Sequence, residues 1–245
     1  MVTQLPSSSQ KDIIYPDSDG QPMADNTKQF ELIVWIKDNL ELLFANDNNV
    51  FVAGDLLWYA VEGDNKLRQA PDVMVVFGRP KGYRGSYQQW FEENISPQVV
   101  FEIWSPGNRI SQMAKKFEFY ERHGVEEYYL YEPDVVDLTG WHRRNSKLEV
   151  IDQMAGWVSP RLGIRFELSE EELQIYRPDG QRFLNYLELD QLRQQERQRA
   201  DQAEATAEQE RQRAEQERQR AEQAEIQLEA LRALLKERGI NPEKL

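Results

Sequence analysis

The chain changes character near residue 190, and this change confines any folded core to the part before it. The seven-residue unit ERQRAEQ recurs at 210–216 and 217–223, and as ERQRADQ at 196–202. Alanine or leucine holds one heptad position throughout, at Ala200, Ala207, Ala214, Ala221, Leu228 and Leu235. The pattern predicts a charged helix over 190–238, roughly 75 Å long at about 1.5 Å per residue. A chain this polar cannot bury a core of its own.

A second heptad position, which would complete the contact line of a coiled coil, is only partly apolar in this helix. Ala203, Ala224 and Leu231 occupy it, while Glu210 and Glu217 interrupt it. Only the final stretch IQLEALRALL carries the leucines that firm association requires. Two interpretations stay open, a solvated charged helix and a coiled coil that pairs protomers through its last two heptads. We expect a homodimer, formed through the globular part, through this helix, or through both.

Composition excludes several classes of protein. The chain has 245 residues, no cysteine and two histidines, so a thiolate or histidine-rich metal centre is excluded and a hard cation held by oxygens is favoured. The net charge is -13, of which residues 1–189 carry -11, and this argues against broad, non-specific nucleic-acid binding. A local basic cleft stays open. Without a 20-residue apolar run or a signal-peptide h-region, we expect a cytoplasmic protein with no membrane contact.

Residues 28–189 read as a single domain that follows a loose arm at 1–27, and the charged helix ends in a tail at 239–245. Helical spacing of apolar residues predicts a helix from Lys28 to about Phe44, capped by Asn26 or Thr27. Strand patterns follow at 49–61, 70–78, 99–104, 126–133, 138–144, 147–151, 156–168 and 172–184, with an irregular connection over 79–98. A second helix follows residue 104, with Asn108 or Ser111 as its cap and Gly124 at its end. Interleaved strands and helices predict an α/β or α+β fold with a mixed sheet.

One buried strand contains an acid that needs a partner. In VVFEIW, at 99–104, Glu102 lies among apolar residues, where an ionised carboxylate costs several kcal/mol unless it is paired, protonated or bound to a metal. Asp72 begins another apolar run, APDVMVVFG. Adjacent strands would bring both carboxylates, and the carbonyl of Ile103, within reach of one cation. Mg²⁺ is the natural choice, and Mn²⁺ is an alternative.

The helix after Glu102 offers a third group. Its predicted apolar stripe consists of Ile110, Met113, Ala114, Phe117 and Tyr120. Lys115 lies opposite this stripe and should point to water, whereas Lys116 lies at its flank and can reach the acids. There its ammonium could orient a water and stabilise charge on a phosphate. An ordinary structural ion-pair network fits the same three residues.

Several segments together resemble the Uma-type restriction endonuclease family, formerly a domain of unknown function, within the PD-(D/E)xK nuclease superfamily. These segments are PDV at 71–73, FEIWSPGNR at 101–109, KFEFYERHGVEEYYLYEP at 116–133 and SPRLGIRFEL at 159–168. The resemblance covers roughly residues 12–189 and implies a restriction-endonuclease-like mixed sheet flanked by helices. It also implies that Asp72 binds metal and that Glu102 is the acid of the (D/E)xK element. Trp104 occupies the usual lysine position, and Lys116, four residues before Tyr120, matches the family's displaced lysine.

The chain departs from the family pattern at two places. Gln112 stands where members often carry an acid, and the polar residue that the first helix contributes is Asn26, Gln29 or Glu31. Candidates for phosphate contacts are the basic residues Arg79, Lys81, Arg84 and Arg109. The resemblance implies Mg²⁺-dependent phosphodiester hydrolysis by an endodeoxyribonuclease, with DNA as the substrate. The alternative is an inactive nuclease-fold scaffold that acts in protein–protein interaction through its C-terminal helix.

Overall fold

Six strands form a mixed sheet at the centre of the fold. The computed structural model describes residues 13–239. The strands lie in the order β1 (Val50–Gly54), β4 (Val73–Phe77), β6 (Val99–Ile103), β7 (Glu127–Glu132), β8 (Asp137–Arg144) and β9 (Lys147–Val150). β6 and β7 are parallel, and all other neighbours in this sheet are antiparallel. The predicted mixed α/β class is confirmed.

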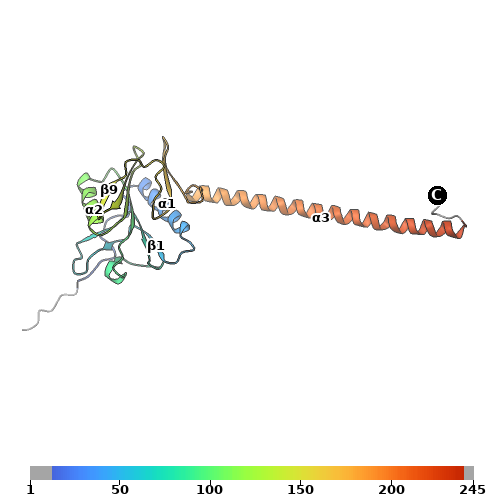
Figure 1. The fold of residues 1–245 in the computed structure, drawn as a ribbon, viewed down its shortest axis with the longest axis horizontal. Helices are drawn as coiled ribbons and strands as arrows, with labels where there is room; N and C mark the ends of the chain where they lie inside the picture. Colours follow the sequence, from blue (N-terminus) through green and yellow to red (C-terminus); the bar gives the residue numbers. More distant parts are fainter. Residues whose placement is uncertain (1–12, 240–245) are drawn as a thin grey trace, which may run out of the picture. The chain divides into compact units, whose positions relative to one another are not determined.

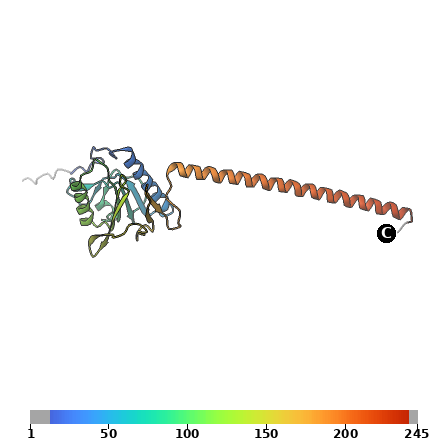
Figure 2. The ribbon, with the colours of Figure 1, turned by 90° about the horizontal axis from the view of Figure 1, so that it is seen from above.

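Two helices cover opposite faces of this sheet (Figure 1; Figure 2). Because side chains alternate along a strand, Val73 and Val75 of β4 pack with α1 (Thr27–Leu43), while Met74 lies in the core that also contains Phe119 of α2 (Ile110–Arg122). The α1 side holds the larger core, with Ile33, Ile36, Leu40, Val99, Phe101, Phe166 and Ile175 among its buried members. Glu102 and Val100 of β6 therefore belong to the face that α2 covers.

Short strands complete the globular unit. β2 (Trp58–Tyr59) pairs with β3 (Arg68–Gln69) and with β5 (Tyr87–Gln88), and β10 (Arg165–Leu168) pairs with β11 (Leu173–Tyr176). The connection that we predicted as irregular over 79–98 contains β5 and the 3-10 helix η1 (Gln89–Phe91). It is ordered because Tyr87 is buried and its hydroxyl donates to the Ile95 carbonyl, 2.7 Å away.

Two details of α2 differ from the sequence prediction. The cap is Arg109, whose backbone N–H donates to the Gln112 side chain at 2.9 Å, whereas Asn108 accepts from the Ser105 backbone N–H in the preceding turn. The buried face is also displaced from the predicted stripe. Met113, Phe119 and Tyr120 are buried, while Ile110 is 80 % exposed and Ala114 is exposed. Phe119 replaces them because its ring packs on Trp58 of β2, a contact between distant segments that helical periodicity does not contain.

The described part of the N-terminal arm is attached to the globular unit. The Tyr59 hydroxyl donates to the Pro16 carbonyl at 2.7 Å, and the ring of Tyr15 lies 5.2 Å from that of Tyr59. Further along, the Asp25 carboxylate accepts from the Ser105 hydroxyl. These contacts hold both ends of the segment 13–26, which composition alone had suggested to be loose. Residues 1–12 of the predicted arm lie outside the described residues.

The long helix α3 runs from Tyr186 to Glu237 and forms a separate compact unit. It begins four residues before the predicted start, because the apolar YLEL at 186–189 continues the helix ahead of the charged repeat. None of its residues is buried. Of the predicted tail, 240–245 lies outside the described residues. No helix in the described chain is long and apolar enough to cross a membrane.

A second buried acid fastens the segment after β9 to the sheet. Glu127 at the start of β7 is fully buried, and its carboxylate accepts hydrogen bonds from the hydroxyls of Tyr129 and Ser159 and from the Arg161 backbone N–H. Its neighbour Glu126 forms an ion pair with the Arg161 side chain at the surface. Neutral donors thus satisfy both oxygens of the buried carboxyl group through hydrogen bonds.

Replacing Glu127 should therefore destabilise the fold. We expect Glu127→Ala to lower the free energy of unfolding by about 2–4 kcal/mol, because it leaves buried hydroxyl and N–H donors unsatisfied. The matched control Glu126→Ala removes only a partly exposed ion pair and should cost at most about 1 kcal/mol. Urea denaturation of both variants measures the difference. Equal losses would contradict the assigned role of Glu127.

Candidate functional site

Glu102 and α2 are joined by two hydrogen bonds to one carboxylate. Glu102 is 1 % exposed, and its Oε2 lies 2.6 Å from Nζ of Lys116. Its Oε1 accepts from the hydroxyl of Tyr120, one helical turn further along the same face. Lys115 is exposed. The structure thus brings together the acid and the lysine that helical spacing selected, and Tyr120 satisfies the second oxygen.

Asp72 comes directly before β4, the strand next to β6, and its side chain contacts the backbone of β6. Its Oδ2 accepts from the Ile103 N–H at 2.6 Å, and Asp72 itself is 6 % exposed. The antiparallel register that pairs Val73 with Phe101 places the Asp72 carboxylate beside Ile103. Asp72, Glu102 and the Ile103 backbone therefore meet at one end of the β4–β6 pair, where the sequence analysis placed them.

Gln29 is the residue of the first helix that joins this group. Its Nε2 lies 3.4 Å from Oδ2 of Asp72 and 3.2 Å from the Ile103 carbonyl oxygen, and its side chain is buried. Of the two other candidates, Asn26 caps α1 by accepting from the Gln29 N–H, and Glu31 is exposed. The sequence left these three open because only the packing of α1 against the sheet decides between them.

The site holds more negative charge than its lysine balances. The pKa of Asp72 is raised to about 7, because burial and the charge on Glu102 outweigh the Lys116 charge and the hydrogen bonds from Ile103 and Gln29. Burial also disfavours the charged form of Lys116, but the carboxylates of Glu102 and Asp72 outweigh it and raise the pKa of the lysine. The resulting surplus of negative charge favours a bound proton or a cation.

Sequence reasoning missed a third acid, Asp55. It follows β1, its backbone N–H donates to the Asp72 carbonyl at 3.2 Å, and it adopts a left-handed conformation with φ 45°. The pKa of its carboxyl is raised to about 6 by burial and by the charges of Asp19 and Glu102, whereas the Lys116 charge lowers it. The signal available in the sequence was an acid in the Gly54-Asp55 bend, which suggested only a turn.

A hollow of about 240 Å³ adjoins the Gln29 side of the site. It is lined by Asn26, Lys28, Gln29, Trp104, Pro106, Pro133 and Asp134. One of these lining residues, Trp104, occupies the position at which the superfamily usually has its lysine. The charge of Lys28 is paired with Asp134 at 3.1 Å.

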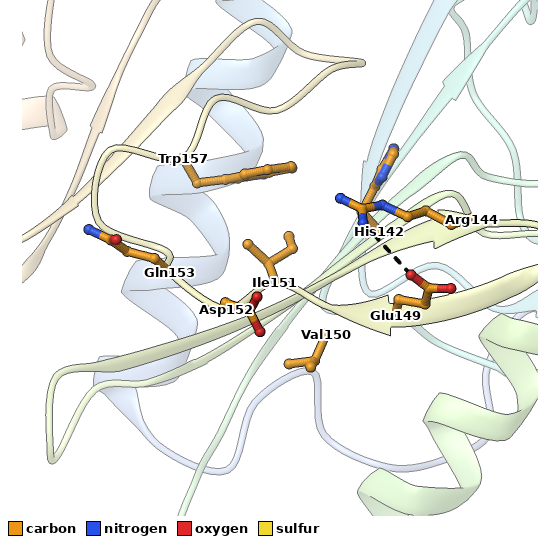
Figure 3. A pocket seen from close by; sticks show the side chains of 8 residues that line it. All are labelled: His142, Arg144, Glu149, Val150, Ile151, Asp152, Gln153 and Trp157. Carbon is orange, nitrogen blue, oxygen red and sulfur yellow. Dashed lines mark ion pairs between the residues drawn. The ribbon is translucent and has the colours of Figure 1, made fainter.

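A second hollow, of about 230 Å³, lies at the β8–β9 edge (Figure 3). Its walls include His142, Asp152 and Trp157, and the Arg144–Glu149 ion pair of 3.8 Å forms part of its lining. In the sheet register His142 is paired with Glu127, whereas Glu102 is paired with Leu130. This hollow therefore belongs to another part of the sheet than the Glu102 group.

Three of the four predicted phosphate-binding residues make contacts within the protein. Arg79 and Arg84 both pair with Glu92, at 2.8 and 2.6 Å, and the Lys81 ammonium donates to the Phe44 carbonyl at the end of α1. Arg109 is exposed at the start of α2. Among the four, Arg79 and Arg84 are paired with an acid, whereas Lys81 and Arg109 are exposed and stay accessible to an external anion.

The donor set fits a hard divalent cation. Asp72, Glu102 and the Ile103 carbonyl are oxygen ligands of the kind that Mg²⁺ and Mn²⁺ prefer, and a cation would balance the surplus charge. In the described residues, no three histidine, cysteine or acidic side chains are grouped so as to hold a metal ion. The protein would therefore contribute two carboxylates and a carbonyl and leave the other ligand positions to water or substrate.

Most of the chain is similar to one family of known proteins. The model of the Uma2 family, described as "Putative restriction endonuclease", matches residues 3–208. A solved structure described as a putative nuclease belonging to DUF820, from Anabaena variabilis, is 17 % identical with a TM-score of 0.42, over 55 % of this chain and 72 % of that one. No curated protein matches the sequence.

The raised pKa of Asp72 predicts a pH-dependent stability difference. A carboxyl with a folded pKa of about 7, against 3.8 in the unfolded chain, contributes stability that is complete below about pH 4 and is lost as the pH rises through 7. Asp72→Asn removes this loss. Relative to wild type, the variant should gain on the order of 1–3 kcal/mol between pH 4.5 and 8. Urea denaturation at both pH values, without divalent metal, measures it, and a difference that does not change with pH contradicts the assignment.

Proposed function

The chain belongs to the Uma2 restriction endonuclease family, and from this premise we propose that it is a metal-dependent nuclease that hydrolyses phosphodiester bonds in DNA. The family supports nuclease function in general and hence a nucleic-acid substrate. The observation that supports this site is the meeting of Asp72, Glu102 and Lys116 at one end of β4 and β6. We place the reaction there.

Asp72, Glu102 and the Ile103 carbonyl would hold the cation. When bound, Mg²⁺ or Mn²⁺ lowers the pKa of a coordinated water and withdraws charge from the phosphate. Gln29 orients both Asp72 and the Ile103 carbonyl, because its amide donates to each of them. Tyr120 orients Glu102 through its hydroxyl, so the two acids are held by α1 on one side and α2 on the other.

Lys116 would act on the reacting groups. Its ammonium is bound to Glu102 in the described state, and its side chain is 21 % exposed, so it is the member of the trio nearest to solvent. From this partly exposed position the ammonium would face the substrate. There it would orient the attacking water and stabilise the charge that develops on the phosphate.

Metal binding tests the acids without requiring activity. Asp72→Asn should weaken Mn²⁺ binding at least about tenfold, because it removes one of the two charged ligands. Lys116→Met should bind Mn²⁺ at least as tightly as wild type, because it removes a competing cation. Isothermal titration calorimetry at pH 8 measures both. Unchanged Mn²⁺ binding by the Asp72 variant would remove Asp72 from the site.

Cleavage assays test the lysine. With plasmid DNA, single-stranded DNA and RNA as substrates and 5–10 mM Mg²⁺ or Mn²⁺, Lys116→Met should lower kcat/KM at least about 100-fold. Asp72→Asn and Glu102→Gln should reduce cleavage to background. The matched control is Lys115→Met, whose side chain lies exposed one residue away and should keep activity within about twofold.

The inactive scaffold is the alternative that these assays would support. The surplus acidity of residues 1–189 and the glutamine at position 112 favour it. Metal binding without cleavage of any of the three substrates would leave the fold as a scaffold. Cleavage by wild type that Lys116→Met retains in full would instead place the chemistry elsewhere in the protein.

A further inference from the structure

Helix α3 presents two heptad rows that stay unburied in the described chain. The first row consists of Tyr186, Arg193, Ala200, Ala207, Ala214, Ala221, Leu228 and Leu235. The second consists of Leu189, Glu196, Ala203, Glu210, Glu217, Ala224 and Leu231. No residue of either row is buried, although Leu189, Leu228 and Leu231 are large and apolar. Rows three and four residues apart form the seam of a two-stranded coiled coil.

The charges in these rows disfavour a parallel pair. In a parallel, in-register coiled coil each seam residue faces its own copy. Arg193 would then face Arg193, and Glu196, Glu210 and Glu217 would each face an identical glutamate across the seam. Four layers of like charge would destabilise the parallel pair, and only the leucine layers at the two ends would stabilise it. Such layers act against an arrangement rather than for it.

An antiparallel pair removes every one of these conflicts. In this arrangement the first row of one helix faces the second row of the other. With Leu189 opposite Leu228 of a second copy, Tyr186 lies opposite its Leu231. In the same register alanine faces each charged seam residue, in the layers Arg193–Ala224, Glu196–Ala221, Ala200–Glu217 and Ala207–Glu210, while Ala203 faces Ala214.

The layer chemistry supports this register. An alanine opposite a glutamate leaves room for the glutamate stem to lie across the seam while its carboxylate reaches water. The apolar end around Tyr186 and Leu189 meets the apolar end around Leu228 and Leu231, and a two-fold axis forms this contact twice. The last turn, from Arg232, extends beyond the Tyr186 of the second copy.

We propose that α3 is an interaction surface for a second copy of this chain, paired antiparallel with Leu189 opposite Leu228. This pairing goes beyond the proposed hydrolysis and does not depend on it. The two globular units of the dimer are attached to opposite ends of the coiled coil, because each α3 begins where its partner's helix ends.

Disulfide trapping tests orientation and register directly. The chain has no cysteine, so the variants Ala203→Cys and Ala214→Cys each carry a single thiol and keep every charge. The two full-length variants, one with a mass tag, are co-expressed, purified and oxidised, and the products are separated on a non-reducing gel. We expect the mixed disulfide to exceed each single-variant disulfide at least about tenfold. Positions 203 and 214 lie about 16 Å apart along one helix, too far for a 203–203 or 214–214 bond in this register.

The other outcomes overturn the proposal. Disulfides between two copies of the same variant indicate a parallel pair, and a statistical mixture of products indicates no fixed register. Sedimentation equilibrium of the wild-type chain should give a dimer, and a monomer at 10–50 μM contradicts the pairing. Leu228→Asp should weaken the dimer at least about 100-fold, whereas Ile226→Asp, at an exposed apolar residue outside both rows, should change it less than about threefold. Equal effects of the two substitutions contradict the assigned seam.

Discussion

The pairing of Glu102 with Lys116 and Tyr120 is the interaction on which the arrangement of sheet, α2 and site depends. The acid lies next to the last residue of β6 and is almost fully buried, so its charge is tolerable only if donors reach it from the covering helix. Lys116 and Tyr120 are four residues apart and therefore point to the same carboxylate. This requirement sets the rotation of α2 about its axis, and the same rotation turns Lys115 to solvent and Phe119 onto Trp58.

Glu127 and Glu102 show two ways to bury an acid in one sheet. Glu127 is satisfied by hydroxyl and backbone N–H donors and pairs with Val99, at the end of β6 away from the site, so it stabilises the fold. Glu102 depends on a cationic partner that is partly exposed and can be displaced. Asp72 is less well balanced still, because burial and the Glu102 charge both raise its pKa. Neutral donors thus hold the structural acid Glu127, whereas Glu102 depends on a lysine and Asp72 has a raised pKa.

The parts of the site that follow from local periodicity could be predicted from the sequence, and the parts that depend on tertiary contacts could not. Lys116 followed from helical spacing, and Asp72 from its place before an apolar strand. Gln29 stayed one of three candidates, because only the packing of α1 on the sheet decides which side chain reaches Asp72. Arg79 and Arg84 were selected as surface cations, but Glu92, eight or more residues away, pairs with both. The mixed sheet followed from the strand pattern, while the small sheet of β2, β3 and β5 did not, since its strands are two residues long.

The acidity of the globular part and the proposed nuclease activity are compatible if the cation is part of the binding surface. Without it, a phosphate would approach two carboxylates that one lysine balances only in part, and repulsion would exclude it. In the proposed function, Asp72 and Glu102 would hold a divalent ion, which would offset their negative charge and lower the cost of ionising Asp72. Affinity for nucleic acid would then be coupled to metal binding. The acidic surface would restrict that affinity to the site, so that the proposed reaction would require substrate and cation together.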